Sequence, residues 1–332
     1  MWTCLFPAGA VMARLLQALL LVQLLIVLGL WHVAWRRWHI GPPDLALLLA
    51  LGMVVLARAA ITVNNFWLSW RGGSATPPPY RLRPAQVCRM VLEEFCSTML
   101  VSSWSMLRPG PALHVAARPV GLPVLLVHGY ACNAAFWKPW CARLAREHIS
   151  HYAVTLEPVT AAIDDYAPQL EAALQQLRAA SGSAQVVLVC HSMGGLVARA
   201  WLRQYGAAHV ARIVTLATPH HGTARASVGL GRSARQMRRS GAPGADANPW
   251  LQALAAMETP AERALFTSLF SHHDNIVEPQ LSAYLPDARN IALAGLGHVT
   301  MGRARRTLQW VLAEIGEASA SAGASSPRRQ GR

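Results

Sequence analysis

Residues 185–195 read Gln-Val-Val-Leu-Val-Cys-His-Ser-Met-Gly-Gly, and this stretch decides the fold. The four consecutive apolar residues that start at Val186 predict a buried strand of a parallel sheet. The glycines and small apolar residues that follow predict a helix packed closely against that strand. Ser192 then lies at a sharp strand-to-helix turn, which exposes its hydroxyl and places the next amide at a helix N-terminus.

Strands and helices are predicted to alternate on both sides of this turn. The predicted strands cover 124–127, 152–156, 212–217 and 265–269, and predicted helices at 136–146 and 166–180 lie between the earlier ones. This alternation predicts an α/β fold with a mostly parallel, doubly wound sheet covered by helices. Residues 227–249 break it with Gly, Arg, Ser and Pro, and we expect a short lid over about 227–262.

Two long apolar stretches precede the alternating region. Residues 15–35 carry no formal charge, and residues 45–63 carry only Arg58, so each stretch is long enough to span a bilayer. We therefore predict a transmembrane hairpin anchor over 1–71, followed by a Gly/Pro-rich linker over 72–79. The alternative is a signal peptide that starts at Met1 or Met12. The first stretch is longer than a usual signal core, and no Ala-x-Ala-like cleavage site follows it.

The charges bear on topology and on partners. Arginines near the spans are more numerous at the chain ends than in the hairpin loop, which favours a two-span protein of the inner (cytoplasmic) membrane with its main domain in the cytoplasm. We expect Arg58 to reach toward that interface. The net charge of +14 comes from scattered arginines, with Lys138 as the single lysine, so we predict no nucleic-acid partner. Oligomeric state is left open.

The cysteines and the C-terminal tail carry no sign of a further functional site. The six cysteines have neither CxxC pairs nor zinc-ligand spacing, so we predict no metal and no cofactor. Cys88 with Cys96, or Cys132 with Cys141, are near enough in sequence to pair, although free thiols are the commoner case. Residues 317–332 are rich in Ser, Ala and Arg, and we predict that this tail is disordered.

A nucleophilic serine needs a base to take its proton and an acid to orient that base. In a doubly wound hydrolase the acid and then the histidine follow the serine along the chain. His298, in a Gly-Leu-Gly-His loop, is the predicted base. Asp274 is the predicted acid because it follows the strand at 265–269, and Glu278 is the reserve. The other acids between Ser192 and His298 are Asp246, Glu258, Glu262 and Asp287.

Negative charge that develops on a substrate oxygen needs two donors already in place. The backbone amide of Met193, directly after the serine, is the first candidate. The second is the amide of Tyr130, in the loop His128-Gly129-Tyr130 that follows the strand at 124–127. His128 precedes the acid in sequence, and we expect it to be structural.

Together, these segments resemble bacterial triacylglycerol lipases and related lipase-like serine esterases of the α/β-hydrolase superfamily. Leu-Val-His-Gly-Tyr, Cys-His-Ser-Met-Gly-Gly and Leu-Ala-Thr-Pro-His-His-Gly-Thr occur in the family's order, and the resemblance covers roughly 123–316. It implies an α/β-hydrolase catalytic domain over 80–316 that cleaves acyl ester or lipid substrates through an acyl-serine intermediate.

Two positions depart from the family. Cys190 replaces the first glycine of the motif, and Thr300 stands where some secreted lipases place a calcium-binding aspartate.

Other functions fit the same residues. The acyl-serine also serves an acyltransferase or a thioesterase, and the fold also suits a non-catalytic membrane scaffold. Epoxide or haloalkane hydrolysis is disfavoured, because those reactions use a carboxylate where Ser192 stands. Acyl chain length and headgroup are not specified by the sequence.

Overall fold

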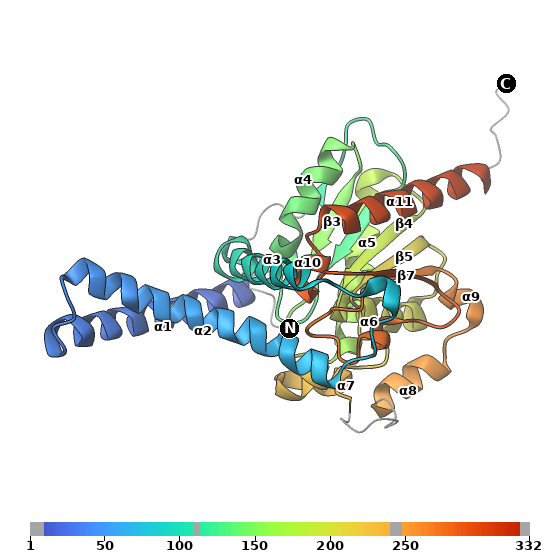
Figure 1. The fold of residues 1–332 in the computed structure, drawn as a ribbon. Helices are drawn as coiled ribbons and strands as arrows, with labels where there is room; N and C mark the ends of the chain where they lie inside the picture. The colour runs from blue at the N-terminus through green and yellow to red at the C-terminus, as the bar shows by residue number, and fades with distance from the viewer. Residues whose placement is uncertain (1–9, 109–112, 240–247, 326–332) are drawn as a thin grey trace.

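The computed structural model describes residues 10–108, 113–239 and 248–325. Within these residues, seven strands form one sheet in the order β1-β3-β2-β4-β5-β6-β7, and only β1 is antiparallel to its neighbour (Figure 1). This is the mostly parallel sheet that the sequence predicts. The strands are β1 Leu113–His114, β2 Val124–Val127, β3 His151–Val154, β4 Val186–His191, β5 Val210–Leu216, β6 Phe266–Ser271 and β7 Arg289–Leu293.

Helices cover both faces of the sheet. The α-helices are α1 Ala10–His32, α2 Pro43–Gly72, α3 Pro84–Ser103, α4 Lys138–Arg146, α5 Ala167–Ser181, α6 Met193–Tyr205, α7 Gly231–Met237, α8 Pro249–Ala256, α9 Pro260–Arg263, α10 His298–Met301 and α11 Arg305–Ser325. A π-helix at Val33–Arg37 prolongs α1, and a 3-10 turn at Ala134–Trp137 leads into α4.

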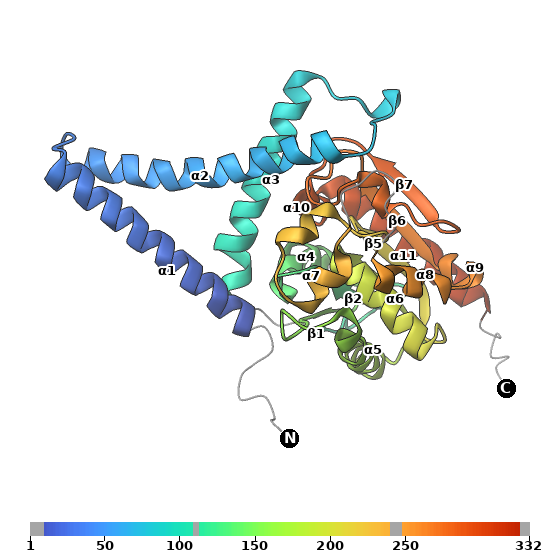
Figure 2. The ribbon, with the colours of Figure 1, turned by 90° about the horizontal axis from the view of Figure 1, so that it is seen from below.

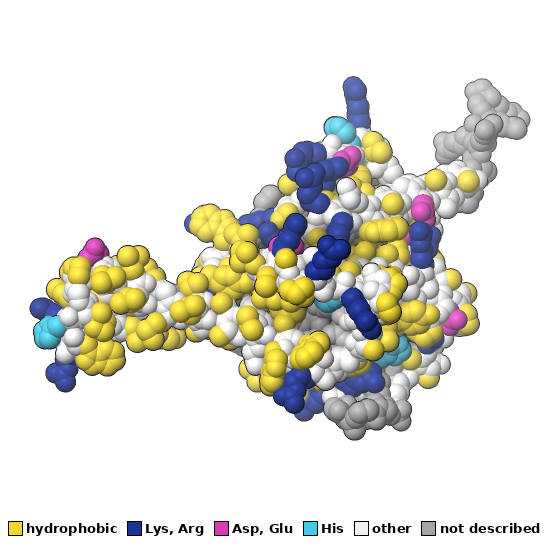
Figure 3. Space-filling view, viewed as in Figure 1, with side chains coloured by type: hydrophobic (Ala, Val, Ile, Leu, Met, Phe, Trp, Pro, Cys, Tyr) yellow, Lys and Arg dark blue, Asp and Glu magenta, His cyan; other side chains and the backbone are white. Residues whose placement is uncertain are grey.

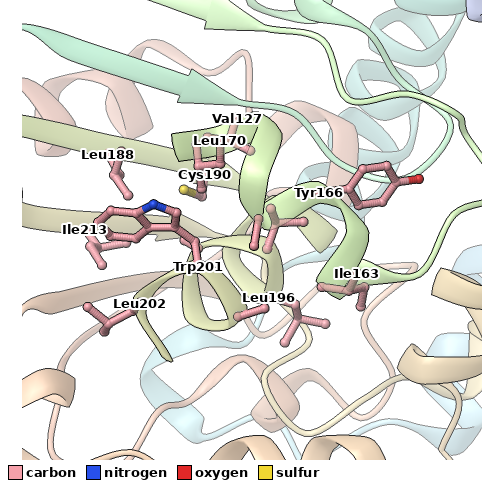
Figure 4. Packing of buried hydrophobic residues seen from close by; sticks show 14 of the residues in the cluster. Val127, Ile163, Tyr166, Leu170, Leu188, Cys190, Leu196, Trp201, Leu202 and Ile213 are labelled. Carbon is pink, nitrogen blue, oxygen red and sulfur yellow. The ribbon is translucent and has the colours of Figure 1, made fainter. Parts of the chain in front are cut away.

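The central strands are buried on both faces of the sheet, so their side chains pack into two separate hydrophobic cores. Leu188 and Cys190 of β4 pack toward α5 and α6, near Leu170 and Trp201 (Figure 4). The alternate residues Val187 and Val189 pack toward α4 and α11 on the opposite face. Burying each Val or Leu contributes about 1.5–3 kcal/mol, so burial on both faces stabilises the strand that carries Ser192.

The two apolar helices form a hairpin that projects from the domain, and α3 crosses between their near ends (Figures 1 and 2). Both are long and apolar enough to cross a membrane, and most of each lies outside the protein interior. The visible surface of the hairpin is almost wholly hydrophobic, with charged side chains at its tip (Figure 3). Met12 and Leu16 bury the base of α1 in the same core as α4 and α11. The hairpin is thus packed on the domain at its base.

The hairpin differs from expectation in two details. The second helix runs to Gly72, nine residues past the apolar stretch that ends at Val63, because its last turns pack on the domain. Arg58 does not reach outward. Its guanidinium donates to Gln23 of α1 and to Ser102 and Ser103 of α3 at 2.6–3.3 Å, which satisfies the charge within the protein.

The predicted disorder of the tail is wrong over its first part. Residues 317–325 continue α11, because Ala318 is buried and the Ser319 hydroxyl accepts the Leu122 amide at 2.9 Å. The remaining tail, 326–332, lies outside the described residues, as do lid residues 240–247 and Cys4. The five described cysteines are free thiols, so neither candidate pair forms a disulfide.

Candidate active site

Ser192 occupies the turn between β4 and α6. Its backbone has φ 54° and ψ −125°, a strained conformation that turns the chain abruptly from strand to helix. Two glycines allow this turn to lie against the loop after β2. A Cβ on Gly129 would come within 2.8 Å of the Ser192 Cβ, and one on Gly194 within 2.7 Å of the Val127 carbonyl oxygen. From the loop after β5, the Thr218 hydroxyl donates to the Ser192 carbonyl at 2.9 Å.

The structure brings together the three side chains that the sequence selects. His298 Nε2 lies 3.0 Å from Ser192 Oγ, and His298 Nδ1 lies 2.9 Å from Oδ2 of Asp274. All three side chains are buried. Oδ1 of Asp274 also accepts the amides of Ile276 and Val277, both at 2.8 Å, which fixes the carboxylate in place. A hydroxyl, an imidazole and a carboxylate thus form one hydrogen-bonded chain.

The charges around His298 favour its protonated form. Burial alone would lower the pKa of His298, but the charge of Asp274, its hydrogen bond and the charge of Glu94 together raise it above the ordinary value. The imidazole is therefore a stronger base than an exposed histidine. Such an imidazole is suited to accept a proton from the Ser192 hydroxyl.

Two further residues hold the backbone of His298. His191 Nε2–H donates to the His298 carbonyl at 3.0 Å, and the Asn275 side chain accepts the His298 amide at 2.9 Å. Burial lowers the pKa of His191 well below its usual range, so its ring is neutral. It stacks on Phe136 with ring centroids 4.7 Å apart. Both contacts restrict the position of the imidazole.

A third residue, Glu94 of α3, contacts α10, the short helix that begins with His298. Its carboxylate accepts the amides of Val299 and Thr300, both at 2.9 Å, and the Thr300 hydroxyl at 2.7 Å. Thr300 is thus bonded through both its amide and its hydroxyl to a buried carboxylate from α3. No group of three or more His, Cys, Asp or Glu suited to a metal ion occurs in the described part of the chain.

The two predicted oxyanion donors flank Ser192. Met193 is the first residue of α6, where the amide has no partner within the helix. Tyr130 directly follows Gly129, where an added Cβ would meet the Ser192 Cβ at 2.8 Å. The Tyr130 hydroxyl donates to the Leu230 carbonyl at 2.7 Å and accepts the Leu230 amide at 2.9 Å, so this loop is tied to the start of α7.

The region predicted as a lid carries α7, α8 and α9 over its described residues. Asp164 connects its helices to the domain, since its carboxylate accepts from Gln236 of α7, Trp250 of α8 and Arg203 of α6 at 2.5–3.2 Å. Val228 and Leu230 at its near edge are 85% and 75% exposed.

The remaining candidates lie elsewhere. The reserve acid Glu278 pairs with Arg225 at 2.5 Å. Glu258 pairs with buried Arg199, and Asp287 lies near Arg263. Asp246 is outside the described residues.

His128 is structural, as expected. Burial lowers its pKa to about 4, and it bonds to the Gly129 carbonyl and the Leu156 amide. Burial also raises the pKa of the Cys190 thiol, which faces the core.

Sequence reasoning missed Glu94, His191 and Asn275. A signal for Glu94 was present, because it shares the inward face of α3 with Met90 and Val101 at helical spacing. An acid on the buried face of a helix requires a partner. His191 and Asn275 adjoin Ser192 and Asp274 in sequence, but only the fold shows that both reach His298.

Comparisons with known proteins agree on the architecture. A family model described as the PGAP1-like alpha/beta domain matches residues 161–230. The structure is similar to the mature form of Bacillus licheniformis lipase BlEst2, with 17% identity, a TM-score of 0.54 and coverage of 62% of this chain and 99% of that chain. Aspergillus fumigatus lipase B is similar over 87% of this chain and 85% of its own, with 14% identity and a TM-score of 0.50. At such identities the similarity establishes the fold.

Proposed function

The chain has the fold of the α/β-hydrolase superfamily, and from that premise we propose that it is a membrane-anchored serine hydrolase that cleaves carboxylic esters. The observation that carries the proposal is the hydrogen-bonded chain from Ser192 through His298 to Asp274 at the strand-to-helix turn. Lipases appear among the similar structures, which supports an acyl ester as the substrate.

The proposed reaction has two halves. Ser192 Oγ attacks the ester carbonyl carbon while its proton passes to His298 Nε2, and Asp274 stabilises the resulting imidazolium. The amides of Met193 and Tyr130 bind the oxyanion of the tetrahedral intermediate. His298 then gives the proton to the departing alcohol, which leaves an acyl group on Ser192. Water, deprotonated by His298, attacks this acyl-serine, and His298 returns that proton to Ser192 Oγ as the carboxylic acid leaves.

The hairpin supports a bilayer location for the substrate. Its two helices suit two membrane spans, and the balance of arginines favours an inner-membrane protein with a cytoplasmic domain. Protease added to inverted inner-membrane vesicles should then digest the domain. Protection of the domain in such vesicles would contradict this orientation.

The direct test is hydrolysis of p-nitrophenyl acyl esters by the purified full-length chain. Wild type should release p-nitrophenol, and Ser192→Ala should lose turnover while it retains the melting temperature of wild type. Ser181→Ala is a matched control, because Ser181 lies at the end of α5 and bonds only to carbonyls of its own helix. Unchanged turnover in Ser192→Ala would overturn the mechanism, and wild type without turnover would favour the scaffold alternative.

A further inference from the structure

The helices α2 and α3 reach the two segments that carry the acid and the base, which are the loop after β6 and the short helix α10. At the end of α2, the Ser69 hydroxyl donates to the Asp274 carbonyl at 2.6 Å. The Gln280 amide joins the same contact, since it donates to Ser69 Oγ at 2.7 Å and to the Asp274 carbonyl at 3.0 Å. The second apolar helix therefore ends on the loop that holds the acid.

The next helix, α3, places a buried side chain against α10, the short helix that begins with the base His298. Glu94 is 1% exposed, and its three hydrogen bonds all go to the two residues directly after His298. The approach is very close, because a Cβ on Gly297 would come within 2.6 Å of the Glu94 carboxylate. The glycine before His298 leaves room for the Glu94 carboxylate, and the two residues after His298 bond to it.

A buried carboxylate is costly unless its oxygens are satisfied. Burial raises the pKa of Glu94 above its ordinary value, and the bonds donated by Val299 and Thr300 and the charge of His298 offset only part of that rise. All three protein contacts place a donor against the carboxylate, which is the arrangement that an ionised group requires. The donors of Val299 and Thr300 and the charge of protonated His298 favour the ionised form, in which Glu94 adds its negative charge to that of Asp274 near His298.

We propose that Glu94 is a positioning residue that holds His298 toward Ser192, so that the segment joining the hairpin to the domain is part of the active site rather than a tether. This inference rests on the proposed serine-hydrolase function. The groups that face His298 are Asp274 from the loop after β6, Glu94 from α3 and neutral His191 from β4. Of these, Glu94 alone belongs to the segment that precedes the sheet.

The test compares Glu94→Gln with Glu93→Gln in the full-length chain, purified in detergent. The two variants make the same isosteric change on adjacent residues, but Glu93 is partly exposed and pairs with Arg89 at 2.7 Å. The first readout is the pKa of the His298 imidazole, measured by NMR and assigned with His298→Gln. Loss of the Glu94 charge should lower this pKa, and Glu93→Gln should leave it nearer the wild-type value.

The second readout is hydrolysis of a soluble p-nitrophenyl ester. Glu94→Gln should lower kcat by about 10- to 100-fold with little change in KM, because the base is misplaced while the pocket remains. Glu94→Asp, which restores the charge, should recover part of the lost pKa shift. If Glu94→Gln does not fold, Thr300→Val removes one of the three bonds and should still lower kcat by severalfold.

The two proposals fail in different ways. A His298 pKa and a kcat that are the same in Glu94→Gln and Glu93→Gln would overturn the role of Glu94 and leave the serine-hydrolase proposal intact. A folded wild-type chain whose His298 has the raised pKa but which hydrolyses no ester would overturn the hydrolase proposal. In that case a fall in the His298 pKa in Glu94→Gln would still support the contact as a determinant of the imidazole.

Discussion

His191 Nε2–H donates a 3.0 Å hydrogen bond to the backbone carbonyl of His298, so the residue before the proposed nucleophile holds the proposed base. The two imidazole rings lie 4.8 Å apart, and burial keeps His191 neutral by lowering its pKa. A second positive charge is therefore not placed beside His298. The strand that leads into Ser192 therefore also holds the start of α10, where the proposed base lies.

His191→Phe tests this contact. The phenyl ring keeps the stacking on Phe136 but leaves the buried His298 carbonyl without its donor, which should cost about 1–3 kcal/mol of unfolding free energy. Ester hydrolysis should fall as well, because the imidazole becomes less well placed. Chemical denaturation and steady-state kinetics measure the two effects. A variant with the stability and kcat of wild type would show that the contact is dispensable.

The pH dependence of kcat/KM should report the raised pKa of His298. The base acts only when neutral, so activity should fall as pH decreases through a pKa above the ordinary value for histidine. Asp274→Asn removes the charge that contributes most to raising it, and the acidic limb should move to lower pH. The same variant should lower kcat about a thousandfold or more, since the tautomer is no longer fixed.

Glu278→Gln is the matched control for Asp274→Asn. Glu278 lies four residues later in the chain, but its carboxylate pairs with Arg225 instead of His298. We expect its acidic limb to stay at the wild-type pH and kcat to change far less than in Asp274→Asn. The opposite ranking of these two variants would make Glu278 the acid.

Gly129→Ala should disrupt the site. The added Cβ would lie 2.8 Å from the Ser192 Cβ and 3.2 Å from the His191 carbonyl, so the loop that carries the Tyr130 amide must move. We expect a loss of turnover of about 100-fold. Gly316→Ala is the control, because its Cβ meets no atom within 4 Å and alanine favours the α11 helix. Equal activity in both variants would place the Tyr130 amide outside the reaction.

Cys190 should be inert as a thiol. It is fully buried against α5 and α6, and burial raises its pKa, so alkylating reagents should label the exposed Cys88 and Cys96 first. Cys190→Gly should keep activity but lower the unfolding free energy by about 1–3 kcal/mol, through the cavity and the flexible glycine. Peptide mass spectrometry and thermal melting test these points. Rapid labelling of Cys190 in the folded chain would refute this placement.

The sequence predicted the sheet because its strands are short apolar runs separated by helices and turns. It also selected Ser192, Asp274 and His298, since the chain has few acids and one late histidine after a glycine pair. Their hydrogen-bonded arrangement agrees with that selection, while their catalytic roles stay predictions. Glu94 was not singled out, although it lies at helical spacing from the apolar residues Met90 and Val101. Contacts between distant loops, such as that of Ser69 with Asp274, leave no mark on local sequence pattern.

Labelling by a fluorophosphonate probe tests the central claim most directly. The probe forms a covalent bond only with a serine hydroxyl activated by a neighbouring base. We predict that the full-length chain is labelled once, that peptide mass spectrometry places the probe on Ser192, and that Ser192→Ala and His298→Gln are not labelled. A folded wild-type chain that remains unlabelled, or a label on a different serine, would contradict the account.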